Sequence, residues 1–447
     1  MKLKKLNFTG EYTLELNRIY EVLTEKLSNN NDVTMDDIEE SFREAALNCG
    51  KIALSKFLTE MSEETPTCPS CGKNMKNHGK RDKQIVTLLG NCEYSRNYYN
   101  CECGEYAIPK DEMLNVSGTK FTQVVKRVTS QIAASDSFRD TSANLKYLCG
   151  IDVSAKEAER IAEDAGAEII AAKQNEIEYS LTELNPTEPE TPANIMYIEY
   201  DGTGVPIRKQ ELAGVKGKQL DGSARSREMK TGCIFTQSGL NDEGKPVRDA
   251  DSTTYFSQIG QLEDFGKLLY SEAVKRGVDY AGQVVVIGDG AKWIWGLASD
   301  NFPNATQIID LYHAKEHVFD VLRTVISNEA ELCAQKRNLY KKLENGDIDG
   351  LVKCFSEFPI NTEEQAEKIR IESNYFMQNK ERMQYQDFSK KGFFVGSGVI
   401  EAACKNVVVK RLKQSGMMWS VAGANKIAAL RCAVMSGEFE PKPQITA

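Results

Sequence analysis

The sequence predicts a multidomain α/β protein, on three observations. After residue 195, apolar strand-like runs alternate with helical stretches. Long charged segments on either side of that series carry apolar residues three and four positions apart, as amphipathic helices do. Residues 66–110 are rich in Cys, Gly and Asn and contain alternating, strand-like runs. A chain of 447 residues is long enough for two or three domains.

Composition narrows the class of protein. The first 20 residues contain no apolar block of signal-peptide length, and no window approaches the roughly 20 apolar residues of a membrane span. We therefore expect a cytoplasmic protein without a membrane partner. The 12 cysteines are too few and too scattered for a disulfide scaffold. The formal charge of -9 argues mildly against nucleic acid as a partner, although local patches matter more than the average.

The N-terminal helical pattern is clearest after residue 33. In "TMDDIEESFREAALNCGKIALSKFLTEMSEE" apolar residues recur at spacings of three and four, and Thr34 or Asp36 is placed to cap the helix.

Two cysteine pairs predict a zinc site in the segment that follows. "CPSC" and "CEC" supply Cys68, Cys71, Cys101 and Cys103. A small region of this kind cannot build much core, so a four-thiolate structural zinc site fits it. Four unrelated buried thiols are the alternative, and Cys92 and His78 match the paired spacing less well.

A basic stretch surrounds the first cysteine pair. It contains Lys73, Lys76, Lys80, Arg81 and Lys83, with Asp82 as the one acidic residue among them. Such a face suits contacts with DNA phosphates. A solvated surface without a partner explains the same residues.

Residues 121–166 have the rhythm of three short helices. "CGIDVS" is typical of a turn, and Ser154 with Glu157 forms a capping box at the start of the last helix. The pattern resembles a helix-turn-helix. That last helix carries four acidic residues beside Lys156 and Arg160, so a helical packing unit that does not read DNA is the alternative.

Beyond residue 195 the order of elements is well marked. Strands are expected in "NIMYIEYDGTGVPI", "KTGCIFTQ", "TTYFSQI", "VVVI" and "TQIID", with helices at 259–276 and from Ala291. Residues 312–388 are expected to be mostly helical, and 397–435 to form one or two helices.

Three carboxylates in this region lie where a ligand site is expected. Asp201 and Asp289 each end an apolar strand and are followed by glycine, and Glu401 lies on a helix expected from Gly398 to Leu412 with Ser397 as its cap. Ligand sites of open α/β sheets lie at such strand ends. Glu199 shares a strand face with Asp201 and is the best decoy for it.

The three carboxylates together predict a site for two magnesium ions. Mg²⁺ prefers oxygen ligands, and two ions roughly 4 Å apart support phosphoryl transfer. The alternative for each residue alone is a solvated or capping side chain. Basic residues follow Glu401 and are predicted to hold a DNA backbone beside the ions: Lys405, Lys410, Arg411 and Lys413.

The most specific motifs are "YDGTGVP", "VVVIGDGAKWIW", "IIDLYHAKEH" and "GSGVIEAACKNVVVKRLKQSGMMWS". With them the chain resembles bacterial insertion-sequence transposases of the DDE type, close to the ISKra group and the mutator-like superfamily. The resemblance implies an RNase H-like mixed-sheet core with a helical insertion, and a catalytic triad of Asp201, Asp289 and Glu401. It also implies two Mg²⁺ or Mn²⁺ ions, double-stranded DNA as partner, and a homo-oligomer during synapsis.

On this resemblance, water attacks a phosphodiester at the element's end, and the freed 3′-hydroxyl then attacks target DNA. The glycines beside Asp289 would clear space for metal and phosphate. Asp310 and His313 match the C/D-x-x-H element of mutator-like enzymes and are expected to support the site, and Trp419 is assigned a role at the DNA end. Zinc binding by His313 with His317 lacks a visible third ligand.

The resulting division of the chain combines these predictions. The segments are a helical region at 1–62, a zinc ribbon at 63–112, a helical region with the helix-turn-helix candidate at 113–178, a linker at 179–194, an RNase H-like core at 195–311 and 396–436, a helical insertion at 312–395 and a tail at 437–447.

Two other functions remain open from the sequence. A domesticated, catalytically silent DNA-binding protein would keep the same fold and zinc ribbon, although the complete triad argues against it. A nuclease of the same fold would cut DNA without joining it.

Overall fold

The computed structural model describes residues 17, 20–21, 24–25, 33–182, 188–217, 219 and 222–439. Most of the helical region expected before residue 33, residues 183–187 of the expected linker and the tail beyond residue 439 lie outside the described residues. The chain divides into two compact units, the first up to Ala162 and the second from Glu163 to Glu440, and each has its own arrangement. The finer division proposed from the sequence stays a prediction.

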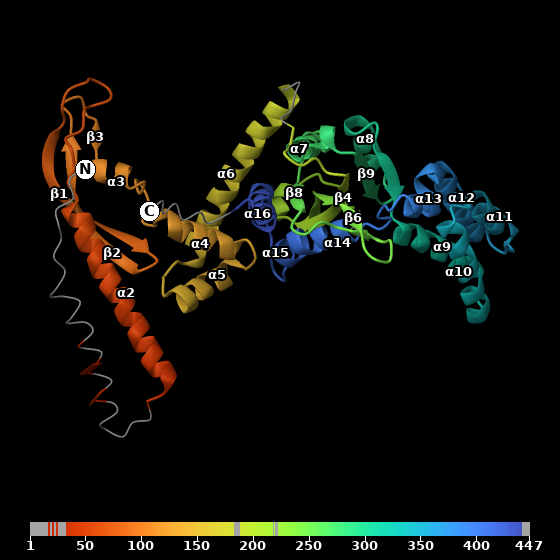
Figure 1. Cartoon of the computed structure of the whole chain (residues 1–447), viewed down its shortest axis with the longest axis horizontal. Helices are drawn as coiled ribbons and strands as arrows, with labels where there is room; N and C mark the ends of the chain where they lie inside the picture. The colour runs from red at the N-terminus through yellow and green to blue at the C-terminus, as the bar shows by residue number, and fades with distance from the viewer. Residues whose placement is uncertain are drawn as a thin grey trace. The chain divides into compact units, whose positions relative to one another are not determined.

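The first unit combines one long helix with a three-stranded antiparallel sheet (Figure 1). Its elements are α2 (Met35–Glu60), β1 (Lys76–Thr87), β2 (Gly90–Asn100) and β3 (Tyr106–Ala107). Thr34 caps α2 in a capping box with Asp37, which confirms Thr34 over Asp36 as the cap. The end of α2 packs on the hairpin through apolar side chains, among them Leu58 and Ile85.

Short helices follow the sheet. They are α3 (Pro109–Met113), α4 (Gln123–Ala133), α5 (Phe138–Asn144), the π-helical turn η1 (Leu145–Cys149) and α6 (Ala155–Thr182), which continues into the second unit. The capping box at the start of α6 is confirmed, because Ser154 and Glu157 exchange side-chain and backbone hydrogen bonds. The linker expected from residue 179 begins one turn too early, since α6 is helical to Thr182.

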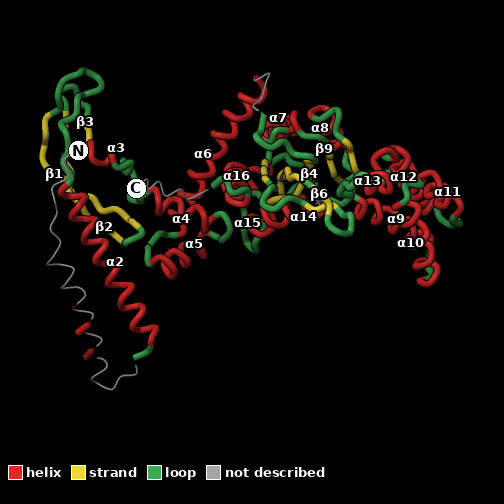
Figure 2. Tube along the Cα trace, viewed as in Figure 1, coloured by secondary structure: helices red, strands yellow, loops and turns green. Residues whose placement is uncertain are grey.

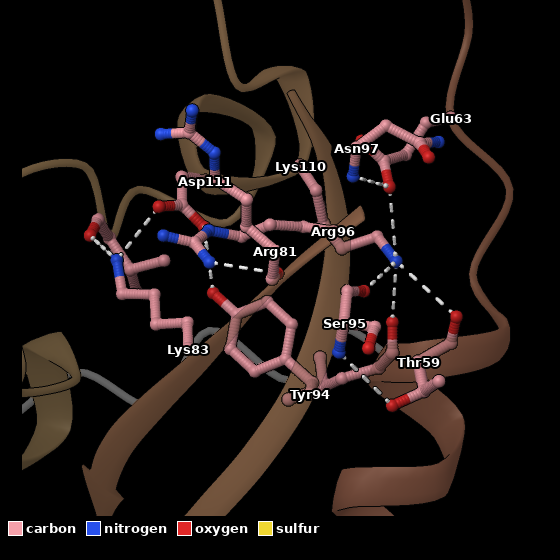
Figure 3. A network of polar contacts seen from close by, with 12 residues as sticks. Thr59, Glu63, Arg81, Lys83, Tyr94, Ser95, Arg96, Asn97, Lys110 and Asp111 are labelled. Atoms are coloured by element: carbon pink, nitrogen blue, oxygen red, sulfur yellow. Dashed lines mark hydrogen bonds and ion pairs between the residues drawn. The ribbon is translucent and has the colours of Figure 1, made fainter. Parts of the chain in front are cut away.

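Buried charges join α2, the hairpin and α3 (Figure 3). The Lys110 side chain is 1 % exposed, and its Nζ lies 3.3 Å from the Glu63 carboxylate. The same Nζ donates to the carbonyls of Leu58 at 2.8 Å and Ser95 at 3.0 Å. All donors of this ammonium are therefore used, which is the condition for burying a charge.

Asp111 is the second buried charge of this network (Figure 3). Its carboxylate accepts from the Tyr94 hydroxyl at 2.9 Å and lies 2.9 Å from Lys83 Nζ and 3.0 Å from Arg96 Nε. Lys83 was expected on the basic face, and that prediction is wrong. Its side chain turns inward because Asp111 neutralises it there.

A five-stranded mixed sheet forms the centre of the second unit. Its strands are β4 (Ile195–Pro206), β5 (Ser226–Gln237), β8 (Thr254–Gln258), β9 (Gln283–Gly288) and β10 (Thr306–Ile309), in the order β10-β9-β4-β5-β8. β4, β5 and β8 pair antiparallel, whereas β9 runs parallel to β4 and β10 parallel to β9. All five strands were expected from the sequence and are confirmed. A small ribbon of β6 (Gly239–Leu240) and β7 (Pro246–Val247) lies apart from this sheet.

Helices pack around the sheet. They are η2 (Lys209–Leu212), α7 (Leu262–Lys275), η3 (Val278–Tyr280), α8 (Lys292–Asn301), α14 (Gly398–Ala403), η5 (Cys404–Val409), α15 (Lys410–Leu412) and α16 (Val421–Met435). The stretch from Gly398 to Leu412 was expected to be one regular helix. In the structure its middle, Cys404–Val409, is a π-helix, and Ser397 makes no side-chain cap hydrogen bond.

The segment between β10 and α14 consists of helices joined by loops. It consists of α9 (Leu311–Val325), α10 (Glu329–Glu344), α11 (Ile348–Glu357), α12 (Glu363–Gln378), η4 (Lys380–Met383) and α13 (Tyr385–Lys390). Figure 1 shows α9 to α13 as a group on one side of the sheet, and Figure 2 draws that group as helices joined by loops. Its apolar side chains continue the core of the sheet.

Within the residues that the structure describes, we find no helix that is both long and apolar enough to span a membrane.

We predict that Lys110→Met destabilises the first unit by about 3–5 kcal/mol, because it leaves the buried Glu63 carboxylate without its cation. Denaturant unfolding followed by circular dichroism should reveal an earlier transition. Tryptophan fluorescence should not move, because all three tryptophans lie in the second unit. The control is Lys76→Met, whose partner Glu102 is exposed and needs no cation. Equal transitions for the two variants would contradict a structural role for Lys110.

Candidate functional site

Asp201 and Asp289 lie on neighbouring parallel strands. β4 and β9 pair from Ile195 with Gln283 to Glu199 with Ile287. Two positions further along these strands come Asp201 and Asp289. Asp289 directly follows β9, as expected, but Asp201 lies inside β4, which stays paired with β5 to Pro206, so the prediction that Asp201 ends its strand is wrong. Both aspartates are half-buried, and Asp289 Oδ1 accepts a hydrogen bond of 2.8 Å from the Ala291 N–H at the start of α8. The two carboxylates are therefore neighbours at one edge of the sheet.

Electrostatics link Asp201 to its surroundings. Burial raises the pKa of Asp201, and the nearby charges of Asp289 and Glu228 raise it further. The N–H of Gly202 and the side chain of His313 act in the opposite direction. A carboxylate surrounded by like charges favours a cation beside it.

Glu401 belongs to the same neighbourhood. It lies in the first turn of α14, and partial burial raises its pKa, with further contributions from Asp310, Glu316 and Asp201. His313 again lowers the pKa. Of the three residues expected as a triad, Asp201 is thus affected by the charge of Asp289, and Glu401 by the charge of Asp201.

The carboxylate oxygens of these three residues do not all lie within 4.8 Å of one another. Among the described residues, the four cysteines of the first unit are the one group in which three or more potential ligand atoms all lie within 4.8 Å of one another. The three carboxylates are more widely spaced. Two ions roughly 4 Å apart, as in enzymes of phosphoryl transfer, accept a wider set of ligands than one ion does.

Two buried carboxylates hold the start of α14. Asp310 accepts from the Ser397 N–H at 2.5 Å and from the His313 N–H at 2.6 Å. Glu199, with no exposed surface, accepts from the Ile400 N–H at 2.9 Å. The N–H groups of Ser397 and Ile400 lie at the start of α14, where backbone N–H groups have no partner within the helix. The sequence indicated Asp310 by its motif, but it gave Glu199 only as a decoy for Asp201.

The glycines around Asp289 have a different role from the one expected. A Cβ at Gly288 would lie 2.8 Å from Ile294, and one at Gly290 would lie 2.3 Å from the ring of Tyr375. Both glycines therefore make room for packing side chains. The interpretation that they clear space for metal and phosphate is wrong, and no local pattern indicated Tyr375, which comes from α12.

The predicted basic stripe after Glu401 is smaller than expected. Lys405, Lys410 and Lys413 are exposed, but Arg411 is fully buried with its guanidinium 5.3 Å from the centre of the Trp419 ring. In this structure Arg411 cannot hold a phosphate. Trp419 is also buried, and its indole N–H donates to the Leu412 carbonyl at 2.9 Å, so it is a packing residue rather than a contact with a DNA end.

The basic face of the first unit is partly neutralised. Lys73 and Lys76 both lie near Glu102, with Lys76 at 2.8 Å. Lys80 is exposed, and the exposed Arg81 lies over the Tyr98 ring at 3.6 Å. These residues remain accessible, and their contact with DNA stays a prediction. The same holds for DNA reading by the start of α6.

The four cysteines meet as their spacing predicted. Cys68 Sγ lies 3.5 Å from Cys103 Sγ, and Cys71 Sγ lies 3.4 Å from Cys101 Sγ. Tetrahedral zinc with Zn–S bonds of about 2.3 Å places its sulfurs about 3.8 Å apart, so the group has the right size for it. None of the 12 cysteines forms a disulfide. Cys92 and His78 lie outside the group.

The thiols of the cluster differ in acidity: the pKa of Cys101 is lowered, whereas the pKa values of Cys71 and Cys103 are raised. Hydrogen bonds from the Cys103 backbone N–H first, and then from the neighbouring thiols, lower the pKa of Cys101 to about 7. The thiolate is the form that binds metal. The cluster can therefore hold a metal ion.

We expect freshly purified protein to contain about one zinc per chain, held by these four thiolates. Cys68→Ser combined with Cys71→Ser should lose it, and hydrogen exchange across β1 and β2 should then accelerate. The control is Cys333→Ser, an exposed cysteine outside the cluster. Elemental analysis gives the result, and equal zinc loss from the control would refute the assignment.

A second prediction concerns Glu199. Burial raises its pKa to about 8, while the Ile400 N–H opposes the shift and the charges of Asp310 and Glu401 add to it. The folded state thus keeps a proton that the unfolded chain loses near pH 4.3. The stability contributed by this proton is complete at low pH and is lost as the pH rises to about 8.

Glu199→Gln carries no such proton and can still accept from the Ile400 N–H. In EDTA, the wild type should lose a few kcal/mol of its free energy of unfolding between pH 4.5 and 8, relative to this variant. Tryptophan fluorescence during denaturant unfolding measures this. Glu199→Leu, which lacks the acceptor, should be less stable at every pH by about 1–3 kcal/mol. Parallel pH profiles for the wild type and Glu199→Gln would contradict the buried neutral acid.

Comparison with known proteins places the chain in a family. The model of an uncharacterised protein family, UPF0236, matches residues 28–444. A UPF0236 protein of Caldanaerobacter subterraneus subsp. tengcongensis, whose name joins eleven locus designations, is 21% identical over 438 residues, which cover 95% of this chain and 81% of the relative. A protein of Streptococcus gallolyticus named for the vanSb 3′ region is 22% identical over 367 residues, which cover 80% of this chain and 74% of the relative. The match to the family model spans most of the chain, and the chain therefore belongs to the uncharacterised protein family UPF0236.

Proposed function

We propose that this chain is a DDE-type transposase that cleaves and joins DNA strands at the ends of an insertion sequence. One observation carries the proposal. Asp201 and Asp289 are neighbours at one edge of the sheet, and Glu401 reaches the same electrostatic neighbourhood from α14. Two aspartates on neighbouring parallel strands and a helical glutamate are the ligand set that a DDE transposase needs.

The charges around the site support a divalent cation. Asp201 and Glu401 both have pKa values raised by burial and by other carboxylates, and His313 is the one basic side chain among the main influences on either group. Asp201, Asp289 and Glu401 would hold Mg²⁺ or Mn²⁺ ions, whose oxygen preference fits three carboxylates. Such ions supply charge stabilisation for the attacking and leaving oxygens of a phosphodiester.

The remaining parts of the proposal follow from the resemblance. The core is RNase H-like, which agrees with three antiparallel strands continued by two parallel ones. The cysteine cluster holds zinc in a zinc ribbon that contacts element ends through Lys80 and Arg81. The exposed lysines after Glu401, namely Lys405, Lys410 and Lys413, contact the DNA backbone. Synapsis of two ends requires at least a dimer.

The names of the relatives agree with a mobile element. One relative's name joins eleven locus designations, and another's joins four. A protein found under many locus designations is what a gene present in many copies would give. Insertion sequences spread in this way, because each transposition can leave a further copy.

The test is a cleavage and joining assay. A labelled duplex that carries the DNA flanking the gene is incubated with the full chain and Mg²⁺. We expect wild type to produce nicked and joined products. Asp289→Asn and Glu401→Gln should bind the duplex and lose at least about 100-fold in rate, since losing an outer-shell partner alone costs 10–100-fold. The control is Asp300→Asn, an exposed carboxylate at the end of α8, which should react like wild type.

The other outcomes decide between the remaining functions. A wild-type protein that binds the end but neither cuts nor joins with Mg²⁺ or Mn²⁺ is a silent DNA-binding protein. Cutting without any joined product indicates a nuclease. Full activity of Glu401→Gln would remove Glu401 from the site.

A further inference from the structure

The helical insertion brings a buried carboxylate and two imidazoles together next to the candidate site. His317 Nδ1 lies 2.7 Å from Glu372 Oε2, and His317 Nε2 lies 3.3 Å from His313 Nε2. Glu372 comes from α12 and both histidines come from α9. His317 and Glu372 are 55 residues apart in the chain. The three side chains form a continuous row of hydrogen bonds.

The chemistry of the row determines which atoms carry protons. Burial opposes ionisation of Glu372, but hydrogen bonds from His317 and Lys368 outweigh it and hold the pKa of Glu372 below its ordinary value. An ionised carboxylate only accepts, so the proton lies on His317 Nδ1. In the neutral ring Nε2 then accepts from the His313 Nε2–H, which leaves His313 Nδ1 as an unprotonated acceptor.

Packing holds the row in place. The Tyr375 ring stacks on His317 with centroids 4.1 Å apart and an interplanar angle of 17°. The same ring fills the space over Gly290, next to Asp289. Lys368 pairs with Glu372 at 2.8 Å from one turn earlier in α12. The His317 ring is thus fixed between its hydrogen bonds and a stacked aromatic ring.

His313 joins this row to the carboxylates. It lies in the first turn of α9, three residues after Asp310, and the same Asp310 carboxylate holds Ser397 at the start of the helix with Glu401. The His313 imidazole is close enough to Asp201 and Glu401 to lower the pKa of both carboxyl groups. Its side chain is 36% exposed, so a substrate can reach it.

We propose that Glu372 is a positioning residue of the candidate active site. It acts through His317 to hold His313 in one tautomer, with an unprotonated Nδ1 that can accept a hydrogen bond. The carboxylate of the exposed Glu316 lies 3.7 Å from this nitrogen. The role in the reaction rests on the proposed function, and the hydrogen-bond row does not. The group that His313 receives is a hydroxyl, such as the water or the 3′-hydroxyl that attacks the phosphodiester. The orientation of an imidazole by a carboxylate on its far nitrogen is a general device of active sites.

Nitrogen NMR of the histidines tests the tautomers directly. The chain has three histidines, so ¹⁵N-histidine labelling gives three imidazoles, with the exposed His78 of β1 as an internal reference. In EDTA at neutral pH, we expect His317 to be protonated at Nδ1 and His313 at Nε2. A wild-type spectrum with the opposite tautomers overturns the proposal, and this result requires no variant.

Glu372→Gln tests the cause. An amide can donate as well as accept, so the Nδ1 proton of His317 loses its fixed acceptor, and its signals should move toward the other tautomer. The control is Glu367→Gln in the same helix, an exposed carboxylate paired with Arg370, which should leave all three imidazoles unchanged. An unchanged spectrum of Glu372→Gln contradicts the proposal.

The cleavage assay tests the role in the reaction. Glu372→Gln should bind the DNA end like wild type and lose about 10–100-fold in cleavage rate, the cost typical of a lost outer partner. Glu367→Gln should cut at the wild-type rate. Normal cleavage by Glu372→Gln overturns the positioning role. A wild-type protein with the expected tautomers that does not cut refutes the proposed function instead, so the two failures are distinguishable.

Discussion

The geometry of the candidate site depends on one buried carboxylate. Asp310 accepts hydrogen bonds from the N–H groups of His313 and Ser397, which begin two helices 84 residues apart in the chain. The five α-helices between those positions are thereby closed into an insertion whose two ends meet at one side chain. Glu401 lies four residues after Ser397, so its position follows from this contact. Inside a protein such bonds are strong, because water does not compete for them.

The chain uses buried carboxylates in two ways. Asp111 has a tyrosine and two cations around it, and Glu199 is held neutral against a helix start. Both accept hydrogen bonds within the protein and have structural roles, although Oε1 of Glu199 has no partner. Asp201 and Glu199 both have other carboxylates as neighbours, but Asp201 is only half-buried, so a cation can reach it. This contrast separates a carboxylate that completes the fold from one that favours a ligand cation.

The acidic net charge is compatible with contact to DNA only through local surfaces. Burial of Arg411 and Lys83 and the pairing of Lys73 and Lys76 with Glu102 reduce the basic surface that the sequence indicates. Of the other basic residues predicted to contact DNA, Lys80 and Arg81 in the first unit and Lys405, Lys410 and Lys413 after Glu401 stay exposed. Three of these five cations therefore lie close to the candidate carboxylate Glu401 in the sequence.

The sequence by itself determined the elements and the local patterns. Five strands, the caps Thr34 and Ser154 and the paired spacing of the cysteines were all readable, because each depends on residues within a few positions of one another. The placement of two aspartates after apolar strand runs was readable for the same reason. The π-helical turn after Glu401 was not, since no local signal distinguishes it from a regular helix.

Tertiary structure decided which polar residues face inward and what they meet. Glu199 and Asp201 lie two residues apart on the same face of β4, so the sequence does not distinguish them. The start of α14 packs over Glu199 and buries it, while Asp201 stays partly accessible. The pairing of His317 with Glu372 and the packing of Tyr375 on Gly290 join residues more than 50 positions apart. Such contacts depend on how whole helices pack, and a local pattern of residue types carries no record of that packing.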